Sequence, residues 1–403
     1  MKCKLTKKEI KPFMSFGKMP LANGFLTEEE FKNEYFFEME VGFSEDLSLF
    51  QLNDHPKPDK MFNKKYPFYT GSSEFMKIHF KNYADWIKKN YLNSNSKLIE
   101  IGSNDGTFLS NFTDANVNYV GFEPSANVAA KAKNNNINTE NSFFNSESIK
   151  NLKNYIKNTD IICAANVICH IPDLKNLIMS VDQLLSKKGL FIFEEPYMGS
   201  MFKKVSYDQI YDEHIFMFTI NSIKKIFNMF DFDLINVIPQ TTHGGSMRYV
   251  VGRKNVHSVD KSVSDGLKLE NNDNLDNINS CLNFKKNCED SKKKIINKLN
   301  KFIDEGKKIC GYAATSKSTT ILNYCDIGTD LIDFISDTTP EKIGKYSPGM
   351  HIPIKHHSFF LKVKPDIAVL FAWNHQKEIM KKEQNFSRQK GKWLTFFPKV
   401  KIW

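Results

Sequence analysis

One short segment of the sequence concentrates side chains that can move protons. Residues 207–216 contain Tyr211, Glu213 and His214, and the same segment holds a further tyrosine and two aspartates. Tyr211 and His214 are three residues apart, so on a helical turn they share one face. A histidine supported by a carboxylate can remove a proton near neutral pH, and a tyrosine hydroxyl can donate to a developing oxyanion. The segment therefore predicts proton-transfer chemistry.

Further polar residues follow the predicted strands and are expected at the same edge of a sheet. Glu195 and Tyr197 end one strand, His170 follows another, and His243 lies in a glycine-containing turn. In α/β folds, ligands bind at the carboxyl ends of the strands. The candidate substrate-binding residues are His170, Glu195, Tyr197, His243, Arg248 and Lys317.

A second pattern predicts a cofactor pocket. An apolar strand at 97–101 runs into a turn with Gly102 and Gly106, and the next strand ends in Glu123, which can accept both hydroxyls of a ribose. The carboxylates of Glu100 and Asp105 would repel a diphosphate, so S-adenosylmethionine, a cation without phosphate, fits better than NAD. The candidate cofactor-binding residues are Ser73, Glu100, Gly102, Asn104, Gly106, Glu123, Pro124 and Asn166.

The elements that must position these residues alternate between short β-prone runs and helix-length segments. Such alternation is typical of a parallel sheet covered by helices. The predicted strands are 97–101, 118–122, 160–164 and 189–193, then 232–239 and 247–252, and finally 308–312, 331–336 and 367–370. The pair at 232–239 and 247–252 is separated by only seven residues and is expected to form an antiparallel hairpin. The predicted parts are an irregular small domain at 1–65, an α/β domain at 66–253, a linker at 254–281, and a second α/β domain at 282–403 that opens with a helix at 282–305.

Composition excludes several classes of protein. The 403 residues are 41% hydrophobic and 25% charged, as in ordinary globular proteins of two or three domains. No apolar run reaches the roughly 18 residues of a membrane helix, and no export signal is visible, so we expect a cytoplasmic protein without a membrane partner. Both a monomer and a dimer are compatible with the sequence.

The net charge and the spacing of the cysteines limit the kinds of ligand and partner that we expect. The net charge is +10, but only three of the 56 basic residues are arginine, which disfavours nucleic-acid recognition. Part of the excess lies at 376–403, which together with Lys317 can serve an anionic substrate such as a nucleotide diphosphate. Seven cysteines form no CxxC pair and no cluster with zinc spacing, so we predict reduced thiols and no metal site.

Ordered motifs along nearly the whole chain resemble those of the sugar C-methyltransferase family, whose members methylate a ring carbon of nucleotide-linked keto-deoxysugars. The matching segments are 19–23, 66–68, 71–73, 100–106, 123–124, 166–173, 207–214, 243–246, 311–313, 322–325, 337, 344, 348–349 and 351–354. The resemblance implies an α/β protein with a central seven-stranded class I methyltransferase (Rossmann-like) domain, a small N-terminal domain and a C-terminal Rossmann-like domain.

The resemblance also implies roles for individual residues. S-adenosylmethionine would be the cofactor, and a nucleotide-diphosphate keto-deoxysugar would bind in the cleft between the last two domains. His214 would be the base and Tyr211 would lie close to the keto oxygen, while His170, Glu195 and His243 would line the substrate pocket.

The sequence departs from the family pattern at two places. The family's N-terminal domain usually holds zinc with two CxxC pairs, but here only Cys3 remains, with Thr6, Ser44 and Leu47 at the other positions. One thiol cannot hold zinc. We therefore expect this domain to be stabilised by packing of Phe13, Phe16, Phe43 and Phe50. The second departure is Asp212, where many members have histidine, together with the loop at 314–317; both bear on substrate choice.

Rival functions differ in the atom methylated or in the class of protein. An O-methyltransferase acting on a sugar hydroxyl would use the same pocket without an enolate. A nicotinamide-dependent sugar-nucleotide oxidoreductase could use either α/β domain. A noncatalytic sugar-nucleotide-binding protein is disfavoured by the intact pair of Tyr211 and His214.

Overall fold

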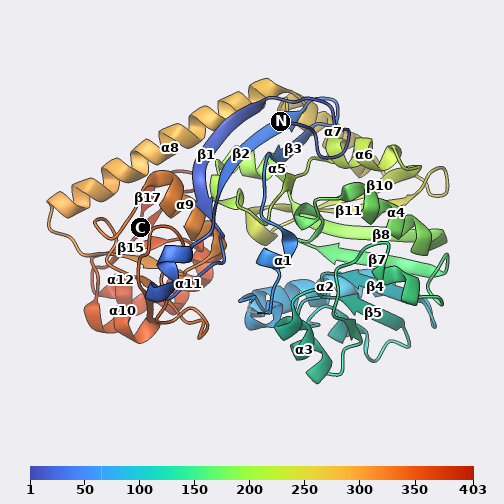
Figure 1. Cartoon of the computed structure of the whole chain (residues 1–403), viewed down its shortest axis with the longest axis horizontal. Coiled ribbons are helices and arrows are strands. Elements are labelled where there is room, and N and C mark those ends of the chain that lie inside the picture. The colour runs from blue at the N-terminus through green and yellow to red at the C-terminus, as the bar shows by residue number, and fades with distance from the viewer. Residues whose placement is uncertain (65) are drawn as a thin grey trace.

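The computed structural model describes residues 1–64 and 66–403, and within these residues the strands form three β-sheets of four, seven and six strands. In Figure 1 the N-terminal strands run across the top, the seven-stranded sheet lies at the right and the six-stranded sheet at the lower left. None of the helices within the described residues is long and apolar enough to cross a membrane.

The N-terminal part is a sheet rather than the irregular segment predicted. Strands β1 (Pro12–Pro20), β2 (Phe36–Ser44) and β3 (Leu49–Leu52) pair antiparallel, and η1 (Glu28–Asn33) connects the first two. The fourth strand, β9 (Phe216–Met217), comes from the neighbouring domain and pairs with β3. The prediction was wrong because Gly17 was read as the end of a strand. Gly17 instead lies within β1, with φ +74°, at a point where the pairing of β1 with β2 is irregular.

The N-terminal sheet has no set of side chains suited to zinc. The Cys3 thiol is buried, while Ser44 and Leu47 occupy two of the expected ligand positions and are buried as well. Phe13 packs edge to face on Phe50, with ring centroids 5.5 Å apart. The four phenylalanines expected to stabilise this part, at 13, 16, 43 and 50, are all buried, which confirms the packing prediction.

The central domain contains the seven-stranded sheet predicted from the family resemblance. Its strands are β4 (Lys97–Ile101), β5 (Asn118–Phe122), β6 (Thr139–Glu140), β7 (Thr159–Ala165), β8 (Leu185–Pro196), β10 (Phe232–Gln240) and β11 (Ser246–Arg253). Its helices are α1 (Pro58–Met61), α2 (Glu74–Tyr91), α3 (Ala126–Asn134), α4 (Leu174–Leu184), α5 (Met198–Lys204) and α6 (Ile220–Asn228). Short 3-10 turns are η2 (Thr70–Ser72), η3 (Leu109–Phe112), η4 (Ser148–Asn151), η5 (Ile168–His170), η6 (Tyr207–Gln209) and η7 (Thr242–Gly244).

The strand order is β10-β11-β8-β7-β4-β5-β6, with β10 and β11 forming the predicted antiparallel hairpin. Strands β4 and β5 have the predicted boundaries. Adjacent residues of β4 face opposite cores: Leu98 packs with α2, and Ile99 packs with α4 and α6. Because both faces are covered, the parallel strands read as continuous apolar runs. The order reverses at β4 and β7, which places the ligand-binding edge at their carboxyl ends.

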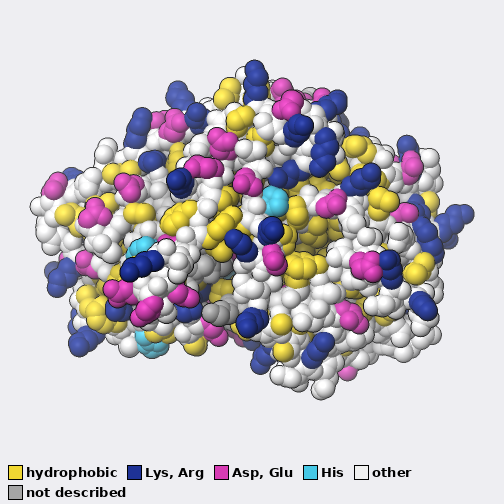
Figure 2. Space-filling view, in the orientation of Figure 1, with side chains coloured by type: hydrophobic (Ala, Val, Ile, Leu, Met, Phe, Trp, Pro, Cys, Tyr) yellow, Lys and Arg dark blue, Asp and Glu magenta, His cyan; other side chains and the backbone are white. Residues whose placement is uncertain are grey.

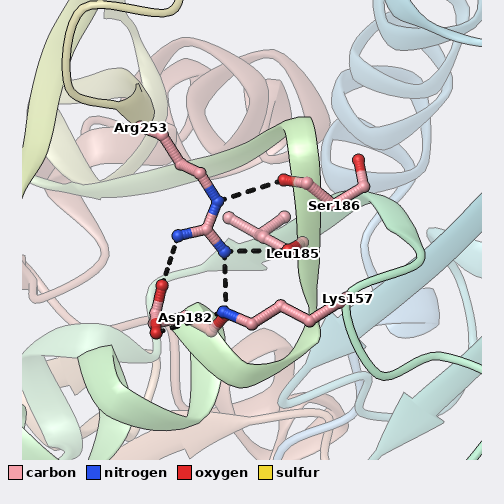
Figure 3. A network of polar contacts seen from close by, with 5 residues as sticks. All are labelled: Lys157, Asp182, Leu185, Ser186 and Arg253. Carbon is pink, nitrogen blue, oxygen red and sulfur yellow. Dashed lines mark hydrogen bonds and ion pairs between the residues drawn. The ribbon is translucent and has the colours of Figure 1, made fainter.

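A polar cluster fastens the end of α4 to the far edge of this sheet (Figure 3). Arg253, the last residue of β11, donates to the backbone oxygens of Ser186 at 3.2 Å and of Leu185 at 2.8 Å. Its guanidinium also pairs with the carboxylate of Asp182 on α4, and Lys157 donates to the Asp182 backbone oxygen at 2.6 Å. These donors satisfy carbonyls that the end of a helix leaves without partners.

The predicted linker at 254–281 connects the two α/β domains but is not free of regular structure. It contains α7 (Lys261–Asn272), which packs on α6 and β10. The buried Glu270 of α7 accepts the backbone N–H groups of Ile220 and Asn221 at the start of α6. The linker prediction was wrong here because α7 presents few apolar residues, and a buried carboxylate makes part of its contact.

The long helix α8 (Ile278–Asp304) leads into the C-terminal domain and forms its outer edge in Figure 1. The strands are β12 (Ile309–Tyr312), β13 (Ile335–Asp337), β14 (Ile354–His356), β15 (Ile367–Leu370), β16 (Lys392–Thr395) and β17 (Lys401–Ile402). The remaining helices are α9 (Ser316–Cys325), α10 (His357–Val363), α11 (Gln376–Lys382) and α12 (Gln384–Arg388), with η8 (Trp373–His375) before α11. The order β14-β13-β12-β15-β16-β17 is parallel except for β17 and reverses at β12 and β15.

Candidate active site

A cavity of about 890 Å³ lies between the central and C-terminal domains. The loops after β4, β5 and β7 line one side, and the loops after β12, β13 and β15 line the other. Asn23, from the segment after β1, also reaches the cavity. Both sheets therefore present to the same cavity the edge at which their strand order reverses, where α/β folds bind ligands.

One wall of the cavity is rich in hydrogen-bond acceptors. Oε2 of Glu100 and Oδ1 of Asn166 are buried and lack hydrogen-bond partners within the described part of the chain. Burial raises the pKa of Glu100 well above its usual range, and the nearby carboxyl of Asp105 adds to the shift. Glu123 accepts the backbone N–H groups of Asn104 at 3.1 Å and of Ser125 at 2.7 Å, which fixes its carboxylate.

Gly102 lines this wall without a side chain. Its φ is +69°, and a Cβ atom there would lie 2.4 Å from Cγ2 of Val167, so the close packing of the loops after β4 and β7 requires glycine at this position. Unsatisfied carboxylate and amide oxygens beside a bare backbone fit the ammonium, sulfonium and ribose groups of S-adenosylmethionine. The donor and acceptor set therefore suits the predicted cofactor.

Most of the predicted cofactor-binding residues line the cavity. They are Ser73, Glu100, Gly102, Asn104, Glu123, Pro124 and Asn166. Gly106 does not line it: at φ +81°, a Cβ atom there would lie 2.8 Å from Ile137, so this glycine permits close packing. Ser73 also accepts the N–H of Met76 and thereby caps α2.

Tyr211 and His214 form a hydrogen-bonded pair whose two members differ in access to the cavity. Nδ1 of His214 lies 2.7 Å from the carbonyl oxygen of Gln209, and a carbonyl can only accept, so Nδ1 carries the proton. Nε2 is then free to accept the Tyr211 hydroxyl, which lies 2.7 Å away. Tyr211 lines the cavity, whereas His214 is fully buried behind it and is not among the lining residues.

Burial keeps this pair neutral. It lowers the pKa of His214 well below its usual range, with a further contribution from His170, and it raises the pKa of Tyr211. The structure thus brings together the two residues that the sequence predicted to share one face, with Tyr211 between His214 and the cavity.

Glu213 also lines the cavity, and two residues from other segments hold it in place. Its carboxylate accepts the side-chain amide of Asn23 at 2.6 Å and the hydroxyl of Tyr66 at 3.1 Å. The neighbouring carboxyl of Asp212 accepts the backbone N–H of Ala22 at 3.1 Å. Burial raises the pKa of both carboxyl groups. Three parts of the chain thus meet at this point.

Three of the six predicted substrate-binding residues line the cavity. His170 and His243 do so, and burial lowers the pKa of each to about 3, so both rings are neutral. Lys317, near the start of α9, places its ammonium 5.5 Å from the centroid of the Trp373 ring. Burial lowers the pKa of Lys317, while the nearby Asp208 opposes this shift.

Glu195 and Tyr197, which were also predicted to bind the substrate, have partners within the protein. The Glu195 carboxylate is fully buried and accepts the backbone N–H groups of Val167, Ile168 and Cys169, so it holds the loop after β7. The Tyr197 hydroxyl donates to Glu270 at 2.9 Å. Neither residue lines the cavity.

Arg248, the sixth predicted substrate-binding residue, does not line the cavity. It forms a buried ion pair with Glu194, with Nε 2.7 Å from the carboxylate, and its guanidinium lies 3.9 Å from the centroid of the Tyr83 ring. His79 on α2 contacts the same carboxylate at 2.6 Å. The group fastens α2 to the sheet, away from the cavity.

Sequence reasoning missed several lining residues. Asn23 and Tyr66 lie in segments quoted for the family resemblance, so that resemblance was the available signal. Lys342 and His375 follow β13 and β15. Their positions at strand ends were the signal that could have identified them. Lys342 donates to the Ala314 carbonyl at 2.7 Å, and burial lowers its pKa.

The cavity is electrostatically asymmetric. The central domain contributes the carboxylates of Glu100, Glu123 and Glu213, and the C-terminal domain contributes Lys317 and Lys342. Over the outer face shown in Figure 2, acidic and basic side chains are interspersed rather than segregated. The two walls of the cavity thus differ in their ionisable side chains, with carboxyl groups from the central domain and amino groups from the C-terminal domain.

Comparison with solved structures gives partial matches. Magnesium protoporphyrin IX methyltransferase from Synechocystis PCC 6803, with bound S-adenosylmethionine, is 12% identical with a TM-score of 0.34, covering 44% of this chain and 79% of its own. A protein from Pyrococcus horikoshii OT3 is 14% identical with a TM-score of 0.37, covering 46% and 95%. The assignment of domains rests instead on the sheet order and on the sequence families.

Comparison with sequence families and curated proteins accounts for almost the whole chain. A putative zinc binding domain matches residues 3–62, a methyltransferase domain matches 75–237, and a C-methyltransferase C-terminal domain matches 241–398. The C-methyltransferase NovU of Streptomyces niveus is 27% identical over 392 residues, covering 96% of this chain and 93% of NovU. With its seven-stranded sheet, its acceptor-lined cavity and its methyltransferase domain, the chain is an S-adenosylmethionine-dependent methyltransferase, and it is similar to C-methyltransferases along almost its whole length.

Proposed function

We propose that the chain methylates a ring carbon next to the keto group of a nucleotide-linked deoxysugar. The observation that carries this proposal is the position of the Tyr211–His214 pair between a carboxylate-rich wall and a wall with lysines. A keto sugar attached to a diphosphate needs a proton acceptor beside the ring and positive charge beside the phosphates. The similarity of the chain to NovU, a C-methyltransferase, supports transfer of the methyl group to carbon.

The wall of the central domain would hold the cofactor. Glu123 would accept the ribose hydroxyls, while Glu100 and Asn166 would accept hydrogen bonds from the amino-acid end. S-adenosylmethionine, when bound, supplies a methyl group on a sulfonium, whose departure leaves a neutral thioether. Gly102 lines the same wall and places no side chain between its backbone and the cofactor.

The Tyr211–His214 pair would remove the proton next to the ketone. The Tyr211 oxygen, at the cavity surface, takes the proton from the ring carbon as its own proton passes to Nε2 of His214. The Gln209 carbonyl fixes the tautomer in which Nε2 can accept and also stabilises the imidazolium that forms. The base is thus the pair, with Tyr211 as its contact with the substrate.

The C-terminal domain would hold the anionic part of the substrate. Lys317 is buried and Lys342 is half-buried on that wall, and His243 reaches the same cavity from the turn between β10 and β11. In a cavity partly shielded from water, each positive charge stabilises a phosphate or an enolate oxygen more than it would in solvent. Glu213 would accept a sugar hydroxyl.

The decisive experiment is transfer from carbon-13 methyl-labelled S-adenosylmethionine to a panel of nucleotide-linked 4-keto-6-deoxyhexoses, followed by NMR of the products. A label bonded to ring carbon is expected. A label on oxygen would instead make the chain an O-methyltransferase and would remove the enolate from the mechanism.

Proton removal can be measured separately from methyl transfer. In deuterium oxide without the cofactor, the wild type should exchange the hydrogen next to the ketone. His214→Asn should lose this exchange while cofactor affinity stays unchanged. Exchange at the wild-type rate in His214→Asn would remove His214 from the proposed role.

A further inference from the structure

Three donor atoms of the kind that bind transition metals meet beside the cavity. The Sγ of Cys169 and one ring nitrogen each of His170 and His214 lie within 4.8 Å of one another, and all three residues are buried. Within residues 1–64 and 66–403 this is the one group of three histidine, cysteine or acidic side chains arranged closely enough to hold a metal ion. His214 comes from a distant segment, so sequence spacing did not predict the group.

A second observation points to a missing ligand at this place. Nε2 of His170 is buried without a hydrogen-bond partner in the described part of the chain. Leaving a buried polar atom unpaired costs about 1–3 kcal/mol. The His170 and His214 rings lie nearly parallel with centroids 5.2 Å apart. Small side-chain rotations would bring the three donors to the roughly 2.0–2.3 Å at which zinc binds nitrogen and sulfur.

Ionisable groups from neighbouring elements surround the three donors. The Glu195 carboxyl group accepts the backbone N–H of Cys169 at 3.3 Å. Glu213 and Lys317 also lie near enough to act electrostatically on the site.

We propose that Cys169, His170 and His214 form a binding site for a borderline-soft divalent cation such as Zn²⁺. Thiolate and imidazole ligands select such ions over Mg²⁺ or Ca²⁺. On binding, a sulfur–metal bond replaces the S–H bond of Cys169, and the proton is released to solvent.

Occupancy of this site would stop the reaction. Nδ1 of His214 is bonded to the Gln209 carbonyl, so a metal would bind Nε2. The same Nε2 lone pair accepts the proton of Tyr211 in the proposed reaction, and it cannot do both at once. The inhibition rests on the proposed function, whereas binding of the metal does not. The site would therefore make the enzyme reversibly sensitive to free zinc.

Binding is tested with Co²⁺ as a spectroscopic probe, added to the full chain in a phosphine reductant. One equivalent should give a sulfur-to-cobalt charge-transfer band in the near ultraviolet, with visible bands typical of tetrahedral cobalt. Cys169→Ser should lose the charge-transfer band, while Cys281→Ser, at another buried cysteine on α8, should keep it. No band in the wild type, or an equal band in Cys169→Ser, would overturn the proposal.

Inhibition is tested by assaying methyl transfer at increasing Zn²⁺ and then adding a chelator. Turnover of the wild type should fall at least tenfold and recover with the chelator. Cys169→Ser, whose hydroxyl can still bond to Glu195, should keep its basal turnover and need at least tenfold more Zn²⁺ for the same loss. Stoichiometric cobalt binding with unchanged turnover in Zn²⁺ would leave the site standing and refute both the inhibition and the role of His214.

Discussion

The side-chain amide of Asn23 donates a 2.6 Å hydrogen bond to Oε1 of Glu213, which joins the N-terminal part directly to the proton-transfer segment. Asn23→Ala should leave one oxygen of a buried carboxylate without its donor and should destabilise the protein by about 1–3 kcal/mol. Turnover should fall more than cofactor affinity, because Glu213 lies beside Tyr211. Urea unfolding and steady-state kinetics measure the two effects. Asn300→Ala on the exposed face of α8 is the control and should change neither.

Tyr211 and His214 should behave as one unit. Tyr211→Phe and His214→Asn should each lower turnover by roughly 10²–10⁴-fold, the range of general acid–base catalysis. The double variant should be little slower than the slower single variant, because each substitution already breaks the pair. Single-turnover assays of the three variants supply this double-mutant cycle. Fully additive losses would mean that the residues act independently.

Gly102 offers a matched test of the open backbone beside the cofactor. Gly102 and Gly306 both have φ +69°, so an alanine at either position carries the same backbone strain of roughly 1–2 kcal/mol. A Cβ atom at Gly102 would meet Val167 at 2.4 Å, whereas at Gly306 nothing lies within 4 Å. Gly102→Ala should therefore lower cofactor affinity at least tenfold, and Gly306→Ala should leave it unchanged. Calorimetric titration with S-adenosylmethionine compares them, and equal affinities would argue against a close approach at Gly102.

Arg248 should matter for stability rather than for substrate binding. Arg248→Met removes the guanidinium that lies 2.7 Å from Glu194 and leaves that carboxylate buried with His79 as its ionic partner. Breaking a buried ion pair costs about 3–5 kcal/mol. Thermal unfolding should show this loss, while KM for both substrates should remain unchanged in the folded fraction. Adding Glu194→Gln to this variant should recover part of the lost stability. A raised KM for the sugar substrate would instead indicate that Arg248 binds the substrate.

Asp208 should make stability depend on pH. Burial raises its pKa from 3.8 to about 6, while the Trp373 indole donates to it at 2.6 Å. The folded protein therefore binds the proton of Asp208 more tightly than the unfolded chain does. The free energy of unfolding that this proton contributes is complete below about pH 4 and is lost as the pH rises through about 6. Asp208→Asn keeps an acceptor for Trp373 and removes the titration. Relative to wild type, the variant should gain up to about 3 kcal/mol between about pH 4 and pH 7 in urea unfolding. A pH-independent difference would contradict the raised pKa.

The sequence predicted best those elements whose signals are local. Strands 97–101 and 118–122 are apolar runs bounded by turn residues, and the structure has them at the same positions. The N-terminal sheet was missed because Gly17 was read as a break within β1 and because β9, the partner of β3, lies far along the chain. A prediction from local pattern cannot include that partner.

The site shows the same division between local and tertiary information. Residues that follow strands, such as Gly102, Glu123 and Asn166, were placed correctly, because strand ends of a parallel sheet share one edge. Glu195 and Arg248 lie within strands, where alternate side chains face opposite sides of the sheet. Which face contacts the cavity depends on the packing of helices, and local pattern does not reveal it.

The pairing of β3 with β9 limits how the enzyme can be recombined with its relatives. Strand β9 begins two residues after His214, so the last strand of the N-terminal sheet is an extension of the proton-transfer segment. A truncated chain starting after β3 would expose the edge of β9 and the apolar face that the N-terminal sheet covers, which favours aggregation. An exchange of the N-terminal module between homologues must therefore carry residues 207–219 with it, and the two segments should be inherited together.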